Sequence, residues 1–420
     1  MLGQIRTILV TSVVALAFAA GCNNQRPEQR PEPTPNTPPT PANPGNPNNP
    51  NNPNNPSGTN TMAPGATNTN GPAVQQGERG APGGPSAAAK DWKNRADKDM
   101  TKVLDELATL GGKPIETLTP AEARKQPTPA DAMNALLKQE GKSTAPEEVA
   151  KVENRTIKAG SASLPARIYT PKDAKAPYPV VLYFHGGGFV IATNDTYDAS
   201  ARGLANGAKA VVVAVDYRKA PENKFPTAHD DANASYAWVL KNAASFAGDP
   251  KNVAVAGESA GGNLALNVAI NARDKKEQLP VAVLAIYPIA SSNTDSKSYR
   301  EFADAKPLDR GMMTWFTNEY VRTPADAQDP RLNLLSANLS GLPDTTIINA
   351  ELDPLATDGE LLEKKLDEAK VSVKRKTYDG VTHEFFGLGA VVGKGKDAMD
   401  FATSRLKDAF GKRANEAALN

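Results

Sequence analysis

From residue 179 onward the chain alternates short, uninterrupted apolar runs with longer stretches in which apolar residues recur at helical spacing. A strand that is apolar at every position must be buried on both faces, and a parallel sheet covered by helices on both faces provides that environment. We therefore predict an α/β fold built on a mostly parallel, eight-stranded sheet. Its expected strands are 151–158, 165–170, 179–184, 210–215, 252–256, 281–286, 345–350 and 371–377, of which the first two form a hairpin. The helices expected between them lie around Ser200 and at 228–240, 263–272, 312–320 and 358–369.

The loops after four of these strands carry residues with catalytic chemistry. Ligands bind beyond the carboxyl ends of parallel strands, so loops at those ends can share one site. The four segments are His185-Gly186-Gly187-Gly188-Phe189, Gly257-Glu258-Ser259-Ala260-Gly261-Gly262, Glu351-Leu352-Asp353-Pro354-Leu355 and Asp379-Gly380-Val381-Thr382-His383. They present a serine, an acid and a histidine in the chain order of an α/β-hydrolase triad.

Ser259 is the predicted nucleophile. It lies in a G-x-S-x-G sequence between an expected strand and an expected helix, and such a turn exposes the serine hydroxyl on a strained bend. The flanking glycines permit the bend because a Cβ there would clash. A bare G-x-S-x-G pattern also arises by chance, so the prediction depends on the other three loops.

His383 is the predicted general base. A serine hydroxyl needs a base within hydrogen-bond reach, and a histidine with its ordinary pKa can take and return a proton at neutral pH. The chain has 3 histidines. His185 belongs to the glycine loop ahead of the nucleophile, and His229 begins an expected helix, so neither follows the acid.

Asp353 is the predicted acid, which would orient the imidazole and stabilise its charged form. Three alternatives are close in sequence. Asp344 precedes its strand, Glu351 lies at the strand end, and Asp358 is expected in the first turn of the next helix.

The glycine loop is predicted to form an oxyanion hole. A tetrahedral oxyanion needs donors placed in advance, and glycine keeps side chains away from backbone amides. Gly187 and Gly188 are the expected donors, with Gly186 as the alternate, and Ala260 after the nucleophile supplies another. The alternative is an ordinary flexible loop.

From about Asp91 to its C-terminus the chain resembles the hormone-sensitive-lipase-like family of α/β-hydrolases, bacterial esterases with a GDSAGG-type turn. The resemblance rests on the four segments above and on Asp216-Tyr217-Arg218-Lys219-Ala220-Pro221-Glu222, expected to be a structural, ion-paired brace. It implies that His185 braces the glycine loop without being catalytic. Three departures stand out, since Phe189, Glu258 and Glu384 occupy positions where tryptophan, aspartate and glycine are common in the family.

The predicted function is that of a serine carboxylesterase that acts through an acyl-enzyme, without metal or cofactor. The resemblance implies short- to medium-chain acyl esters as substrates. The alternative is an envelope acetyl-sugar deacetylase or an amide or lactam hydrolase, because these reactions share the oxyanion intermediate. A non-catalytic receptor on the same fold would be expected to lack a triad residue, and none is missing here.

The composition argues against nucleic-acid binding, a Cys/His metal site and an internal disulfide. The net charge of +1 offers no field that would attract nucleic acid. With 3 histidines and 1 cysteine, the chain is a poor candidate for a Cys/His metal site and cannot form an internal disulfide. No feature of the sequence specifies an oligomeric state.

Residues 1–21 are predicted to be a bacterial lipoprotein signal peptide. Arg6 precedes an apolar run from Ile8 to Ala20, and small residues lead into Cys22. We expect Cys22 to carry acyl chains such as palmitate, which would hold an exported protein at the cell envelope through the membrane. Asn23 favours the outer membrane, on the periplasmic or the surface side. The alternative is an ordinary secretory signal that happens to end near a cysteine.

Residues 22–89 are predicted to be a disordered tether rich in proline, asparagine and glycine, in which Asn-Asn-Pro occurs three times in succession from Asn48. A neutral low-complexity insert is the alternative. Residues 90–148 are expected to form a helical cap, with one helix from Trp92 to Leu110 and a second at 130–139, joined by a loop. These helices either cover a pocket or serve only packing. The catalytic domain is predicted at 149–420.

Overall fold

The eight predicted strands are all present and form one sheet. The computed structural model describes residues 91–419, so the predicted signal peptide, Cys22 and the tether lie outside the described residues. The domain boundaries at 89/90 and 148/149 stay predictions. The strands are β1 (Lys151–Ala159), β2 (Ala162–Thr170), β3 (Tyr178–Phe184), β4 (Val211–Val215), β5 (Gly248–Glu258), β6 (Val283–Ile286), β7 (Thr345–Leu352) and β8 (Val373–Thr382).

The strand order across the sheet is β1-β2-β4-β3-β5-β6-β7-β8. β1 and β2 form the predicted antiparallel hairpin, and β2 is also antiparallel to β4. All other neighbouring pairs are parallel, which confirms the predicted mostly parallel α/β sheet. The carboxyl ends of β3, β5, β7 and β8 therefore meet at one edge, and each of the four predicted catalytic segments lies at the end of one of these strands.

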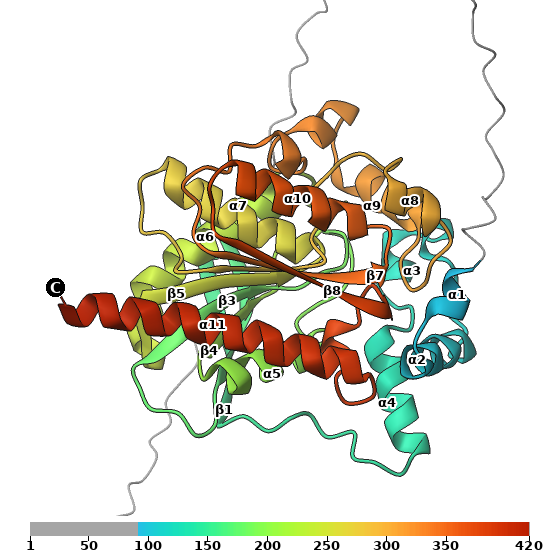
Figure 1. Cartoon of the computed structure of the whole chain (residues 1–420), viewed down its shortest axis with the longest axis horizontal. Coiled ribbons are helices and arrows are strands. Elements are labelled where there is room, and N and C mark those ends of the chain that lie inside the picture. Colours follow the sequence, from blue (N-terminus) through green and yellow to red (C-terminus); the bar gives the residue numbers. More distant parts are fainter. Residues whose placement is uncertain (1–90, 420) are drawn as a thin grey trace, which may run out of the picture. The chain divides into compact units, whose positions relative to one another are not determined.

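Helices cover both faces of the sheet (Figure 1). On one face lie α5 (Asp198–Ala208) and α11 (Gly393–Leu419), and on the other lie α6 (Thr227–Asn242), α7 (Ala260–Asp274) and α10 (Ala356–Glu368). Side chains of β3 alternate between the two layers, since Leu182 packs with the second group and Val181 with the first. Within residues 91–419, no helix has both the length and the apolar character needed to cross a membrane.

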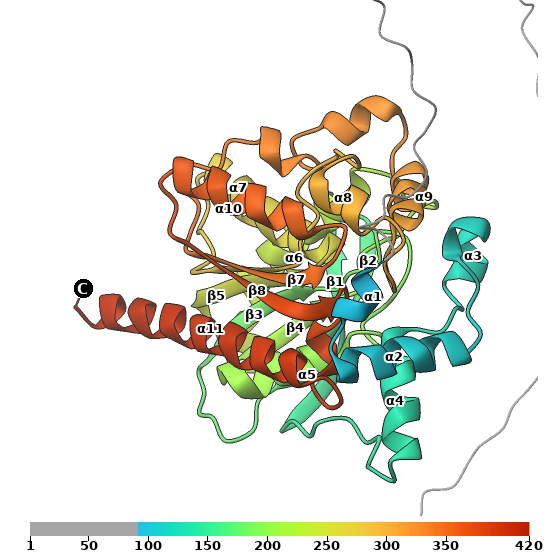
Figure 2. The same cartoon turned by 45° about the vertical axis from the view of Figure 1, so that its right-hand side comes forward.

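The N-terminal helices lie at the end of the sheet toward which β7 and β8 point, near α8 (Lys297–Glu301) and α9 (Arg310–Tyr320) (Figures 1 and 2). The prediction of one helix from Trp92 to Leu110 was wrong. The chain is extended at Ala96 and Asp97, where the Asp97 amide donates to the Gly380 carbonyl at 2.8 Å. This tertiary contact divides the segment into α1 (Trp92–Arg95) and α2 (Lys98–Thr109).

The expected loop between the N-terminal helices contains a short helix, α3 (Pro120–Ala123). Thr119 accepts from the Glu122 amide, and the Glu122 carboxylate accepts from the Thr119 amide, so a capping box starts this turn. The second predicted helix is present as α4 (Pro129–Gln139). Met133 and Leu137 of α4 pack into the same core as α5 and α11. The N-terminal segment therefore contributes to the core on that face of the sheet.

Two strand ends differ from the prediction in a way that affects the site. β7 continues to Leu352 and β8 continues to Thr382, beyond the expected ends at residues 350 and 377. The register shifts after Ala350, so that Leu352 pairs with Thr382. Asp353 and His383 consequently follow the last residues of two paired strands directly.

Candidate active site

Ser259 occupies the turn between β5 and α7. Its φ of 56° is in the left-handed region, which is uncommon for a residue with a side chain and typical of a strained nucleophile turn. The Ser259 amide donates to the Ile286 carbonyl at 2.8 Å, and the Ser259 carbonyl accepts from the Ile289 amide at 3.2 Å. A Cβ on Gly261 would collide with the backbone carbonyl of Phe184, so the close approach of α7 to β3 requires glycine. The predicted strand–turn–helix is thus present.

His383 and Asp353 are hydrogen-bonded at the ends of β8 and β7. His383 Nδ1 lies 2.7 Å from Asp353 Oδ2, and both side chains are buried. The second carboxylate oxygen, Oδ1, accepts from the Leu355 amide at 2.9 Å. A carboxylate can only accept, so Nδ1 carries the proton and Nε2 of the neutral ring is left with its lone pair.

The charges around His383 favour its protonated form. Burial lowers the pKa of this imidazole, but the charge of Asp353 and its hydrogen bond raise it, and Glu384 and Glu258 add to that effect. The net result is a pKa above the usual value for histidine. Such a ring is a stronger base than a free imidazole and is ready to accept a proton.

The three alternative acids have other partners. Glu351 binds Arg95 and accepts from the Gly380 amide. Asp344 lies at the opposite end of β7, where it pairs with Arg405. Asp358 lies in the first turn of α10, as expected, and its Oδ2 accepts from two backbone amides, those of Ala290 and Ser291.

The two other histidines are held in separate networks. His229 Nε2 donates to Asn263 Oδ1 at 3.0 Å and its Nδ1 accepts from the Tyr320 hydroxyl at 2.9 Å. Burial lowers the pKa of His229 to about 4, and burial lowers that of His185 to about 3, so both rings stay neutral at physiological pH.

His185 lies beneath the glycine loop. Its Nδ1 donates to the Gly186 carbonyl at 2.7 Å, and its ring stacks on Tyr217 with centroids 4.4 Å apart. In the following stretch Arg218 pairs with the buried Asp231, and Glu222 pairs with Arg124, which agrees with a structural, ion-paired brace.

The glycine loop turns sharply beyond β3. Gly187 and Gly188 have φ values of 94° and 59°, and the Gly187 carbonyl accepts from the amides of Val190 and Ile191. The backbone amides of Gly187, Gly188 and Ala260 donate to no acceptor within the part of the chain that the structure describes. Ala260 is the first residue of α7, where helix amides are free to bind an anion.

Arg124, directly after α3, links the N-terminal helices to the glycine loop and to the Asp216–Glu222 stretch through hydrogen bonds. Its guanidinium donates to the carbonyls of Val190 and Ala220 and forms a two-pronged pair with Glu222. Sequence reasoning missed this residue because Arg124 lies in a stretch interpreted as a loop. Only the fold places it beside residues that lie 66 to 98 positions away in the chain.

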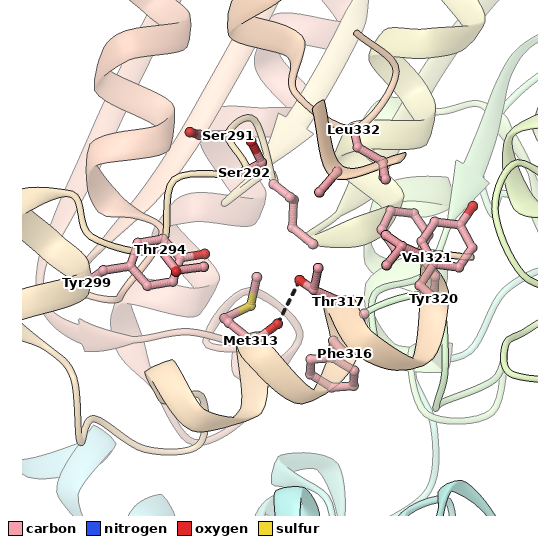
Figure 3. Close-up of a pocket in the computed structure, with 14 residues that line it drawn as sticks. Ser291, Ser292, Thr294, Tyr299, Met313, Phe316, Thr317, Tyr320, Val321 and Leu332 are labelled. Atoms are coloured by element: carbon pink, nitrogen blue, oxygen red, sulfur yellow. Dashed lines mark hydrogen bonds between the residues drawn. The ribbon is translucent and has the colours of Figure 1, made fainter. Parts of the chain in front are cut away.

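A narrow apolar cavity of about 50 Å³ adjoins the glycine loop. Figure 3 shows Met313, Phe316 and Tyr320 of α9 on one side of it and Ser291 and Leu332 on the other. The Phe316 ring lies against Gly188 so closely that a Cβ there would overlap it. Sequence analysis predicted α9 as a helix but carried no signal that this helix lines a cavity beside the glycine loop.

A larger cavity of about 720 Å³ lies between α4, α5 and the start of α11. None of the predicted triad or oxyanion residues lines it. Among the described residues, no group of three or more histidine, cysteine, aspartate or glutamate side chains could hold a metal ion.

Comparison with known proteins identifies the family. A family model described as alpha/beta hydrolase fold matches residues 181–387. Carboxylesterase NlhH of Mycobacterium tuberculosis is 39% identical over 266 residues, which cover 62% of this chain and 83% of that protein. The chain belongs to this α/β-hydrolase family, which includes the hormone-sensitive-lipase-like esterases. The predicted α/β-hydrolase fold is thereby confirmed.

Other relatives of this hydrolase are similar in sequence and structure. Ethyl acetate hydrolase of Pseudomonas putida is 31% identical over 310 residues, covering 72% of this chain and 95% of that protein. The crystal structure of a hyperthermophilic esterase from the archaeon Pyrobaculum calidifontis matches with a TM-score of 0.69 and 34% identity, over 75% of this chain and 98% of that one. Carboxylic ester hydrolysis is the named activity that these relatives share.

Proposed function

We propose that this carboxylic ester hydrolase is a serine esterase with Ser259 as nucleophile, His383 as general base and Asp353 as orienting acid. The observation that carries the proposal is the buried Asp353–His383 hydrogen bond at the ends of two paired strands. Ser259 lies on a strained turn at the same edge of the sheet. Asp353 holds the tautomer that leaves Nε2 free to accept a proton.

The reaction proceeds in two halves. Ser259 Oγ attacks the ester carbonyl carbon while its proton moves to His383 Nε2, and the carbonyl oxygen becomes an oxyanion. The amides of Gly187, Gly188 and Ala260, with Gly186 as the alternate, are the donors for that oxyanion. The bond to the alcohol oxygen then breaks, and Nε2 returns the proton to the departing alkoxide. Water, deprotonated by Nε2, attacks the acyl-enzyme, and the carboxylic acid leaves as Ser259 regains its proton.

The cavity beside Gly188 favours a short acyl chain. Its volume of about 50 Å³ has room for only a few non-hydrogen atoms, and its lining is largely apolar. The named substrate of the Pseudomonas putida relative, ethyl acetate, is a small ester. We therefore propose short-chain esters as the preferred substrates, with medium chains accepted less well. The comparisons do not favour deacetylation of sugars or hydrolysis of amides and lactams.

We also propose that the protein is exported and held at the bacterial cell envelope by lipid on Cys22. The support is the sequence of residues 1–22 alone, in which an apolar run ends in small residues before the cysteine. Incorporation of an alkyne-labelled palmitate into the wild type, but not into Cys22→Ser, tests this proposal. Equal labelling of both would contradict it.

Hydrolysis of p-nitrophenyl esters from acetate to dodecanoate by the full-length protein tests the proposed function. We expect kcat/KM to be highest for the short acyl chains. A fluorophosphonate should label Ser259 stoichiometrically, as located by mass spectrometry, and Ser259→Ala should be neither labelled nor active. Labelling of another residue, or ester turnover below that of a chromogenic lactam, would overturn the proposal.

A further inference from the structure

Two of the three residues that depart from the family pattern, Glu258 and Glu384, lie near the proposed base, His383. Glu258 precedes the proposed nucleophile at the end of β5, and Glu384 follows His383 just beyond the end of β8. Glu258 is fully buried, and about a fifth of the Glu384 side chain, 22%, is exposed. Burying one carboxylate is costly in free energy, and a second carboxylate beside it adds repulsion, so such a pair is retained only where the surrounding groups stabilise it.

Phenol hydroxyls hold both carboxylates in place. The Tyr183 hydroxyl donates to Glu258 Oε1 at 2.5 Å, and the Tyr287 hydroxyl donates to Glu258 Oε2. The Tyr197 hydroxyl donates to Glu384 Oε1 at 2.7 Å. These three tyrosines come from β3, from the segment after β6 and from the start of α5, so the arrangement is built by the tertiary fold.

Glu384 points its carboxylate at the reacting nitrogen of His383. Its Oε1 lies 3.8 Å from Nε2, which is too long for a hydrogen bond and short enough for a strong charge interaction. Glu384 also has a φ of 69°, an uncommon value for a residue with a side chain. Strained backbone is retained where the surroundings enforce it, and the Tyr197 hydroxyl bond provides such enforcement.

We propose that Glu384 is a positioning residue for ester hydrolysis, whose carboxylate, fixed by Tyr197, stabilises the imidazolium that His383 forms when it takes the proton of Ser259. This proposal rests on the proposed function. Because Glu384 stays beyond hydrogen-bond distance of Nε2, it leaves that nitrogen free for the serine hydroxyl. Asp353 acts at Nδ1, and Glu384 supplies negative charge on the side of Nε2.

Tyr197 also contacts the glycine loop. The Tyr197 hydroxyl lies so close to Gly186 that a Cβ on Gly186 would overlap it. Tyr197 therefore touches the loop that we propose to hold the oxyanion and also fixes the carboxylate that faces the base.

Other ionisable groups surround the Glu384 carboxylate. Burial and the charge of Glu384 together raise the pKa of Glu258 to about 7, so Glu258 is partly protonated at neutral pH and the repulsion in the pair is reduced. Burial raises the pKa of Glu384 as well. Burial also keeps the neighbouring phenols protonated, so that they remain donors. Ionisable side chains of the described residues that interact electrostatically with His383 or Glu384 include Asp353, Glu258, Tyr183, Tyr197, Tyr217 and Tyr287.

Glu384→Gln tests the role of the charge with little change of shape. Without the carboxylate the pKa of His383 falls, so the acid limb of the kcat/KM profile should move to lower pH by about one unit. Imidazolium stabilisation is lost as well, so kcat at the plateau should fall roughly three- to tenfold, with KM little changed. Glu363→Gln, which alters a carboxylate paired with Arg375, is the matched control and should leave the profile unchanged.

Glu384→Gly gives a second variant because glycine adopts the positive φ without strain. It should show the same acid-limb shift as Glu384→Gln. A merely structural role would lower activity and melting temperature without moving the midpoint. An unchanged midpoint in both variants, with wild-type hydrolysis still dependent on Ser259, would overturn this inference and leave the proposed function intact. Hydrolysis that persists in Ser259→Ala would instead overturn the proposed function.

Discussion

The hydrogen bond between Asp353 and His383 allows the sharpest test, through Asp353→Asn. Asp353 Oδ1 accepts from the Leu355 amide at 2.9 Å, so the amide oxygen of the asparagine should keep that bond. Its NH₂ group would then face His383 Nδ1, which lies 2.7 Å from Oδ2 in the wild type. Two donors cannot face each other, so the ring must move its proton to Nε2. A ring protonated at Nε2 cannot accept the proton of Ser259.

The size of the effect follows from this geometry. The change removes a charge-assisted bond between two buried groups and selects the wrong tautomer of the base. Loss of the correct tautomer in a serine triad lowers kcat by about 10⁴-fold, equivalent to roughly 5.5 kcal/mol of transition-state stabilisation. The fold should survive, because asparagine has the shape of aspartate and keeps the Leu355 bond.

The assay is steady-state hydrolysis of p-nitrophenyl acetate, with the melting temperature measured on the same samples. Asp344→Asn and Glu351→Gln are the matched controls, since they alter the alternative acids at either end of β7. Both controls should retain kcat within about twofold, as expected for carboxylates outside the chemistry. Retention of more than a tenth of kcat by Asp353→Asn, or an equal loss in either control, would refute the reasoning.

Three further predictions concern the cavity, the base and the loop anchor. Phe316→Ala opens the cavity beside Gly188. The ratio of kcat/KM for the butyrate ester to kcat/KM for the acetate ester should then rise about tenfold, because each buried methylene contributes about 0.8 kcal/mol. An unchanged ratio would contradict the assignment of this cavity to the acyl chain. In the wild type, kcat/KM should fall as the pH drops through a midpoint above about 6.5, because the pKa of His383 is raised and only the neutral ring accepts a proton; a profile that stays flat to about pH 5 would argue against this base. Arg124→Ala removes the bonds to Val190 and Ala220 and should cost about 2 kcal/mol. In a folded domain of this size that loss lowers the melting temperature by roughly 3 °C, whereas Arg155→Ala on the exposed strand β1 should change it little.

Much of the fold could be predicted because it depends on local patterns. Unbroken apolar runs such as Val180–Phe184 identify strands buried on both faces, and the glycines around Ser259 identify a tight strand-to-helix turn. The failures occurred where a distant contact overrides the local pattern. The bond from Asp97 to Gly380 interrupts one predicted helix, and pairing of Leu352 with Thr382 extends β8 through a glycine.

The sequence by itself therefore determined the α/β architecture and the order of the serine, acid and histidine, because strand burial, turn chemistry and chain order depend on residues that are neighbours in the sequence. Tertiary structure alone decided which carboxylate reaches His383, that Phe316 narrows the cavity beside Gly188, and that Tyr197 holds Glu384 beside Nε2. Each of these contacts joins residues from separate elements, and their meeting depends on strand order and on how helices pack across the sheet. Local periodicity carries no information about such distances.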